Sequence, residues 1–181
     1  MADDESPISF KVHVARLPKR GMPVMIEADE SQRQALAAIH ELLEVKRFRV
    51  DAMVTEWSRE GVRVSGHINA DIVQACVVSL EPLPAVIDEE IDALFVPARS
   101  RLARQDWLDT GEIVVSADGP DIPDTFEGEE IDVGAVAEER FALALDPYPR
   151  KADVDQASFS TGDVEEEPSP FAQLARLKRD S

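Results

Sequence analysis

The 181-residue sequence is poor in cysteine, and its single Cys76 excludes both an internal disulfide and a zinc site built from cysteines. It also lacks any run approaching eighteen apolar residues, so we expect no membrane-spanning helix. The acidic start, Met1 to Pro7, has no apolar segment of the kind found in secretory signals. Together with the lone cysteine, this predicts a protein of the reducing cytoplasm.

Motifs of the common catalytic sites are absent as well. The two glycines of Gly61–Gly66 are not followed by Lys-Ser or Lys-Thr, and there is no Gly-x-Ser-x-Gly. His13, His40 and His67 are far apart, and each is predicted to be a surface or partly buried side chain. The apolar neighbours of Cys76 favour an inert, buried thiol. We therefore expect no enzyme, no cofactor and no metal, although the many carboxylates leave a paired acid–base site open.

Basic residues are scarce relative to acidic ones. Lys and Arg number 19 against 37 Asp and Glu, which gives a net charge of −18. Most of the excess lies in residues 111–170, where 3 basic residues stand against 17 acidic ones. Such a charge repels nucleic-acid phosphates and attracts cationic partners. It is compatible with a surface that only maintains solubility and with an acidic face for a basic partner.

Alternation of apolar and polar residues predicts four strands, at 8–15, 48–57, 62–70 and 87–97. The turn Arg59-Glu60-Gly61 joins the second and third strands into an antiparallel hairpin. Residues 71–81 either continue the third strand or follow it, and prolines are expected to interrupt pairing after them. In the fourth strand Ile87 and Ile91 share one face, whereas the other face carries acids expected to meet water or basic groups. The prolines are Pro82 and Pro84, and the acids are Asp88, Glu90 and Asp92.

Two segments have helical periodicity. In 31–45 the apolar positions recur at helical spacing, and Asp29 or Ser31 can cap the first turn. In 132–145 Asp132 is the expected N-cap, and the prolines that follow end the helix. The sequence thus predicts an α+β fold: a mainly antiparallel sheet, for which a barrel-like curl is one option, with two main helices and a short C-terminal helix.

The domain organisation follows from composition. We expect a disordered N-terminus at 1–7, a single α+β domain at 8–149, an acidic mobile segment at 150–169 and a short amphipathic helix at 170–180. Residues 98–130 are the hardest to interpret, with a short helical piece at 101–107 and a loop at 117–124.

One group of basic residues is a candidate binding site. These residues flank the first strand and Phe48, and a basic patch with an aromatic ring can hold RNA by phosphate neutralisation and stacking. An ordinary surface of mixed charge is the alternative. The group comprises Lys11, Arg16, Lys19, Arg20, Lys46, Arg47 and Arg49.

Two segments, Gln74–Pro82 followed by Ile87–Phe95, resemble the centre of the YceD-like family, also described as large ribosomal RNA subunit accumulation protein. Ile131–Arg150 is similar to the family's helix and its Asp-Pro-Tyr-Pro ending, and Ser169–Lys178 to its short tail helix. Many members have a second cysteine where this chain has Ser79, so a thiolate pair is lost. The motif positions are Cys76, Leu80, Glu81, Pro82, Asp146, Pro147, Tyr148 and Pro149.

The resemblance implies a non-catalytic factor needed for normal levels of large-subunit ribosomal RNA. Ribosomal proteins are strongly basic, so an acidic factor can bind a ribosomal protein or an assembly intermediate. A direct RNA-binding protein that uses the basic group is the main alternative. A metal-dependent nuclease is the third, and it requires carboxylates that converge on a pocket. No membrane partner is expected.

Overall fold

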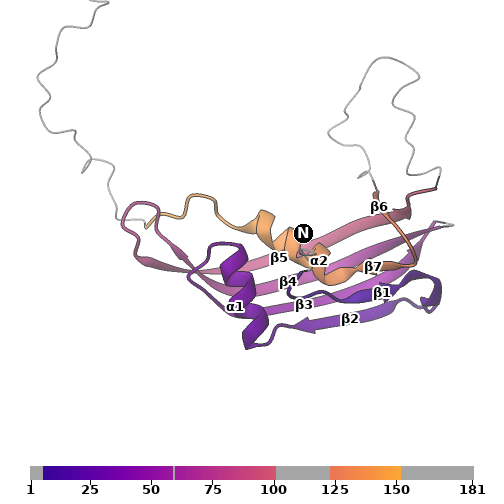
Figure 1. Cartoon of the computed structure of the whole chain (residues 1–181), viewed down its shortest axis with the longest axis horizontal. Coiled ribbons are helices and arrows are strands. Elements are labelled where there is room, and N and C mark those ends of the chain that lie inside the picture. The colour runs from indigo at the N-terminus through magenta and orange to yellow at the C-terminus, as the bar shows by residue number, and fades with distance from the viewer. Residues whose placement is uncertain (1–5, 59, 101–122, 152–181) are drawn as a thin grey trace, which may run out of the picture. The chain divides into compact units, whose positions relative to one another are not determined.

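The computed structural model describes residues 6–58, 60–100 and 123–151. Its main sheet has the strand order β2-β3-β4-β5-β6, antiparallel except for the parallel pair β5–β6 (Figure 1). A second sheet pairs β1 with β7. The strands are β1 Lys11–His13, β2 Met22–Glu27, β3 Glu44–Trp57, β4 Gly61–Ala75, β5 Pro82–Pro97, β6 Asp124–Phe126 and β7 Glu130–Asp132; the helices are α1 Glu30–Ile39, α2 Val133–Ala144 and the short 3-10 helix η1 Val14–Arg16.

The predicted hairpin is confirmed and is longer than expected. β3 and β4 pair from Trp57 and Gly61 to Glu44 and Val73, with one bulge between Val45 and Arg47. Residues 71–75 therefore continue β4. Because the side-chain period of a strand is two, each strand sends one set of residues to each face of the sheet.

One face of the main sheet is covered and forms the core. Figure 1 shows α1 and α2 crossing this face. Phe48 of β3 and Phe141 of α2 are both fully buried, and their rings meet edge-to-face with centroids 5.2 Å apart. Leu36 brings the apolar side of α1 into the same cluster. Aromatic pairs in this geometry stabilise the contact beyond the area they bury.

The first helix starts as predicted but ends earlier. Asp29 accepts from the Gln32 N–H at 2.9 Å and Gln32 reaches back to the Asp29 N–H, so Asp29 forms a capping box. The predicted extension of the helix to residue 45 is wrong, because Glu41 has a φ of +54° and the Leu43 N–H bonds to the Val73 carbonyl of β4 at 2.9 Å. The apolar spacing continues through a chain that has already left the helix.

The prediction that Pro82 and Pro84 interrupt pairing is also wrong. Pro82 pairs with Ala75 and Pro84 with Val73. The Cys76 N–H donates to the Glu81 carbonyl at 2.9 Å, and hydrogen-bonded pairs alternate along an antiparallel ladder. The nitrogens of both prolines therefore point away from β4, where no ladder hydrogen bond is lost.

The N-terminal segment is held against the start of α2. Of the predicted strand 8–15 only β1 is a strand, and it pairs with β7 instead of joining the main sheet. Asp132 caps α2 as predicted by accepting from the Ala135 N–H at 3.0 Å. It also accepts from the Phe10 N–H at 2.9 Å and from the Ser9 hydroxyl at 2.5 Å. Burial raises the pKa of Asp132, but these hydrogen bonds outweigh burial and lower it.

The α+β prediction is confirmed, but the sheet does not close into a barrel. β2 lies at one edge and β6 at the other, and the two do not pair; the helices, not a curled sheet, bury the covered face. In the described part of the chain, no helix is long and apolar enough to cross a membrane. Several predicted segments lie wholly or largely outside the described residues: 1–7, 101–107, 117–124, 150–169 and the helix at 170–180.

Candidate functional site

The structure brings together the two segments whose residues resemble the family pattern. After β4 the chain turns through Cys76–Glu81, with the Leu80 N–H donating to the Cys76 carbonyl at 2.9 Å. The segment after α2 lies against this turn, since the Val77 N–H donates to the Pro149 carbonyl at 2.9 Å. We call residues 74–82 and 146–151 the motif junction.

Two further side chains close the junction. The Gln74 amide nitrogen donates to the Asp146 carbonyl at 2.9 Å, and the Lys151 ammonium lies 2.9 Å from a Glu81 carboxylate oxygen. The Lys151 charge and hydrogen bond lower the pKa of Glu81. Neither Gln74 nor Lys151 was predicted as a contact from the sequence. Gln74 lies within the segment that resembles the family pattern, but no spacing rule connects it to a residue 72 positions away.

The course of the second segment follows from its own sequence. Leu145 is already extended, with φ −68° and ψ 136°, because α2 ends just before a proline-containing stretch. The Asp146 carboxylate then accepts from the Tyr148 N–H at 2.9 Å, which forms an Asx turn around Pro147. The chain is thereby directed along the Cys76 turn. Leu80 and Tyr148 are exposed at the junction, whereas Cys76 is fully buried.

The Cys76 thiol is buried as predicted, but its surroundings favour the thiolate. The Ser79 hydroxyl and then the N–H groups of Ser79, Lys151 and Val78 donate hydrogen bonds towards the sulfur and lower its pKa to about 6.

We expect the thiol of Cys76 to titrate with a midpoint near pH 6, measured as thiolate absorbance at 240 nm. The assignment is unambiguous because the chain has one cysteine. Ser79→Ala removes the first hydrogen bond and should move the midpoint upward. The pKa of Cys76 is lower in the folded protein than in the unfolded chain, so the thiolate adds to the free energy of unfolding. This contribution is fully present above the pKa of the unfolded thiol and is lost as the pH falls through about 6. A midpoint near 9 in the wild type would contradict this environment.

The seven basic residues of the candidate RNA patch are spread over the structure. Arg16, Lys19 and Arg20 are exposed in η1 and the turn before β2, whose first residue pairs with Val54 of β3. Arg47 lies towards the other end of β3, about 24 Å from Val54 along the strand. Lys46 is at the bulge and Lys11 is on β1. The structure groups Arg16, Lys19 and Arg20, but it does not bring them next to the basic residues that flank Phe48.

The arginines of the uncovered sheet face are neutralised by acids. Arg47 pairs with Asp71 at 2.9 Å across β3 and β4, and Arg49 pairs with Asp51 at 2.7 Å. The hydrogen bond to Arg49 lowers the pKa of Asp51 and raises that of Arg49. Binding RNA phosphates through these two arginines would require breaking both pairs.

The acids of β5 lie on the uncovered face, as the alternation predicted. Asp92 is held by the Arg63 guanidinium at 2.6 Å, and Asp88 accepts from the Asn69 amide at 2.8 Å. Glu90 is paired with His67 in the ladder. In the described residues, Asp88 and Glu90 have no Lys or Arg within ion-pair distance. The expectation that this face meets water or basic groups is confirmed.

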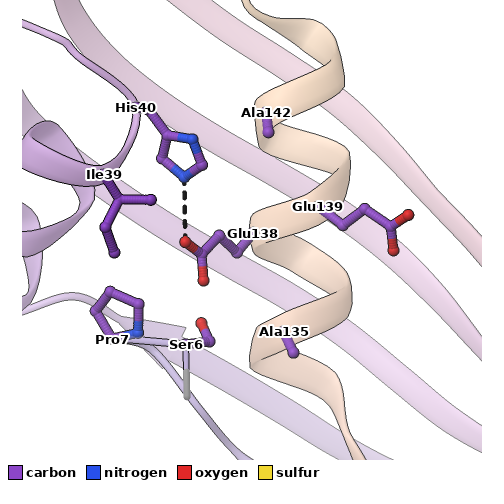
Figure 2. A pocket seen from close by; sticks show the side chains of 8 residues that line it. All are labelled: Ser6, Pro7, Ile39, His40, Ala135, Glu138, Glu139 and Ala142. Atoms are coloured by element: carbon purple, nitrogen blue, oxygen red, sulfur yellow. Dashed lines mark hydrogen bonds and ion pairs between the residues drawn. The ribbon is translucent and has the colours of Figure 1, made fainter. Parts of the chain in front are cut away.

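A separate hollow of about 310 Å³ lies between α1, α2 and the N-terminal segment (Figure 2). Its lining includes one interacting pair, in which His40 Nε2 lies 3.1 Å from Glu138 Oε1 and both side chains are largely buried. Figure 2 shows Glu138 pointing towards His40 and Glu139 pointing away from it. The His40 ring also meets Phe141 edge-to-face at 5.4 Å, so this pair joins the two helices to the core. Among the described residues there is no group of three or more metal-ligating side chains.

The fold and these surfaces define an α+β protein whose antiparallel sheet has one face covered by helices and one acidic face left uncovered. The family model described as large ribosomal RNA subunit accumulation protein YceD matches residues 64–178. The chain belongs to this family. The matched span starts in β4 and includes β5, α2 and the whole motif junction. The description connects the family with accumulation of large-subunit ribosomal RNA and names no reaction. Neither the curated proteins nor the solved structures gave a match.

Proposed function

We propose that the protein is a non-catalytic cytoplasmic factor that supports accumulation of large-subunit ribosomal RNA by binding a basic ribosomal protein or an assembly intermediate. The observation that carries the proposal is the acidic, uncovered sheet face, where Asp88 and Glu90 form no salt bridge with a Lys or Arg among the described residues. Long-range attraction between an acidic factor and a basic partner accelerates their encounter and falls as salt rises.

The net negative charge of this face favours a cationic partner over RNA. Among the described residues, the three arginines of this face each pair with an aspartate, so their positive charge is largely cancelled. Glu27 of β2, Asp88 and Glu90 of β5 then add negative charge to the same face. A phosphate backbone that approached this face would meet net repulsion.

An affinity purification of the tagged protein from its own cells, with and without RNase, tests the proposal. We expect basic ribosomal proteins to be retained after RNase treatment, with retention decreasing as salt is raised. Loss of every partner after RNase would instead favour direct RNA binding through the basic group that includes Arg16, Lys19 and Arg20. Retention of neither proteins nor RNA would contradict both forms of binding.

A further inference from the structure

One strand of the main sheet has an open hydrogen-bonding edge. β5 pairs with β4 along its length, from Pro82 to Phe95. On its other side β6 pairs only with the last three residues, from Phe95 to Pro97. Within the described residues, the stretch before them has a strand neighbour on one side only (Figure 1).

The register shows which residues face this edge. Because Cys76 and Glu81 are a hydrogen-bonded pair, the odd-numbered residues of β5 bond to β4 and the even-numbered residues turn their N–H and C=O groups outward. Arg140 supports this assignment, since its guanidinium reaches the outward carbonyl of Asp92 at 3.5 Å. The N–H and C=O groups of Val86, Asp88 and Glu90 have no hydrogen-bond partner among the described residues.

The same residues send their side chains to the uncovered face. A bare edge can pair with any extended chain, and proteins restrict this with prolines and charges. Pro82 and Pro84 remove two outward N–H groups at the start of β5. Beyond them Asp88 and Glu90 repel acidic strands, a second copy of this strand included, and favour a strand with cationic side chains on the same face.

We infer that the edge of β5 from Val86 to Glu90 takes up an extended, basic segment of a partner protein as an added strand. Lysine or arginine at alternate positions would face Asp88 and Glu90. The residues between them, if apolar, would lie beside Ile87 and Ile91 on the covered face. Backbone hydrogen bonds give affinity in this mode of recognition, and the alternate side chains give specificity. The inference rests on the proposed function, for which it names the docking strand and the chemistry of the partner.

The first test uses the full chain and a capped nine-residue peptide in which lysine alternates with valine. Two derivatives carry N-methyl groups, one on the lysine amides and the other on the valine amides. All three have the same charge, but only one set of amides can face β5 in an added strand. We expect one derivative to lose binding at least tenfold by fluorescence anisotropy and the other to bind like the parent peptide. Equal binding by all three, or no binding by any, overturns the inference.

The second test changes the protein without changing its charge. Val86→Pro removes one outward N–H while the ladder to β4 stays complete, and Val86→Ala removes the side chain but keeps the N–H. We expect Val86→Pro to weaken peptide binding about tenfold, in line with the loss of one hydrogen bond, and Val86→Ala to leave it nearly unchanged. Equal effects of the two substitutions would overturn the inference. Circular dichroism establishes that both variants are folded.

Hydrogen exchange measured by NMR gives a readout that does not depend on substitution. In the complex the N–H groups of Asp88 and Glu90 should gain protection, whereas those of Ile87 and Glu89 already bond to β4 and should change little. Peptide binding without this pattern would mean that charge alone attracts the peptide. That result would contradict strand addition but would be compatible with the proposed function. Strand addition by the peptide, with no ribosomal protein retained from cells, would instead refute the proposed function and leave the edge as a peptide-binding site.

Discussion

Gly134→Ala is expected to destabilise the protein by about 3 kcal/mol, although alanine is the better helix former. A Cβ at this position would lie 1.9 Å from the Ile8 carbonyl oxygen and 2.9 Å from the Phe10 nitrogen. Both neighbours are backbone atoms, so no side chain can rotate to relieve the contact. The gain in helix propensity is only about 1 kcal/mol. The steric overlap therefore outweighs the gain in helix propensity, and the net effect of Gly134→Ala on stability is destabilising.

Urea unfolding of wild type and variant measures this effect. Gly128→Ala is the matched control, because nothing lies within 4 Å of its added Cβ. It should cost about 1 kcal/mol through its left-handed φ of +77° alone. The account of the N-terminal segment would be contradicted if Gly134→Ala were as stable as the wild type.

Phe141→Ala is expected to cost about 3–5 kcal/mol, the range for removing a fully buried aromatic ring. The ring is fully buried and meets Phe48 and His40 edge-to-face, so its loss leaves a cavity where α1, α2 and β3 meet. Typical domains are stable by only about 5–15 kcal/mol, so the variant should lose a large share of its stability.

Leu143→Ala on the same helix provides the control. Leu143 is 73% exposed, and its replacement should change the free energy of unfolding by less than about 0.5 kcal/mol. Chemical denaturation followed by circular dichroism compares the two variants under the same conditions. Similar unfolding midpoints for both would mean that α2 does not pack through Phe141.

Local chemistry explains why some of the fold could be predicted. The β3–β4 hairpin follows from alternation and a turn between neighbouring segments, and the Asp132 cap from a short acidic side chain before an apolar helix. The end of α1 could not be predicted in the same way. The apolar spacing of Leu42 and Leu43 continues the helical pattern, although the positive φ of Glu41 and the bond from Leu43 to Val73 show that the chain has turned.

The candidate sites could not be predicted in full, because they depend on pairing between residues that lie far apart in the sequence. The motif residues were identified by resemblance, but their meeting depends on bonds such as Gln74 to Asp146 and Lys151 to Glu81. The basic residues near Phe48 are close in sequence, but Arg47 forms its salt bridge with Asp71 of the neighbouring strand β4. The outward direction of Pro82 depends on the ladder register, which no single segment contains.

The most direct test of the central claim compares two charge variants in the purification from RNase-treated cell extract. Asp88→Asn/Glu90→Gln removes two acidic charges from the uncovered face of β5, and Glu41→Gln/Glu44→Gln makes the same charge change at exposed positions near α1. We expect the first variant to retain about tenfold less ribosomal protein than the wild type and to show a weaker salt dependence, while the second behaves like the wild type. Equal retention by all three would contradict binding through the acidic face of β5.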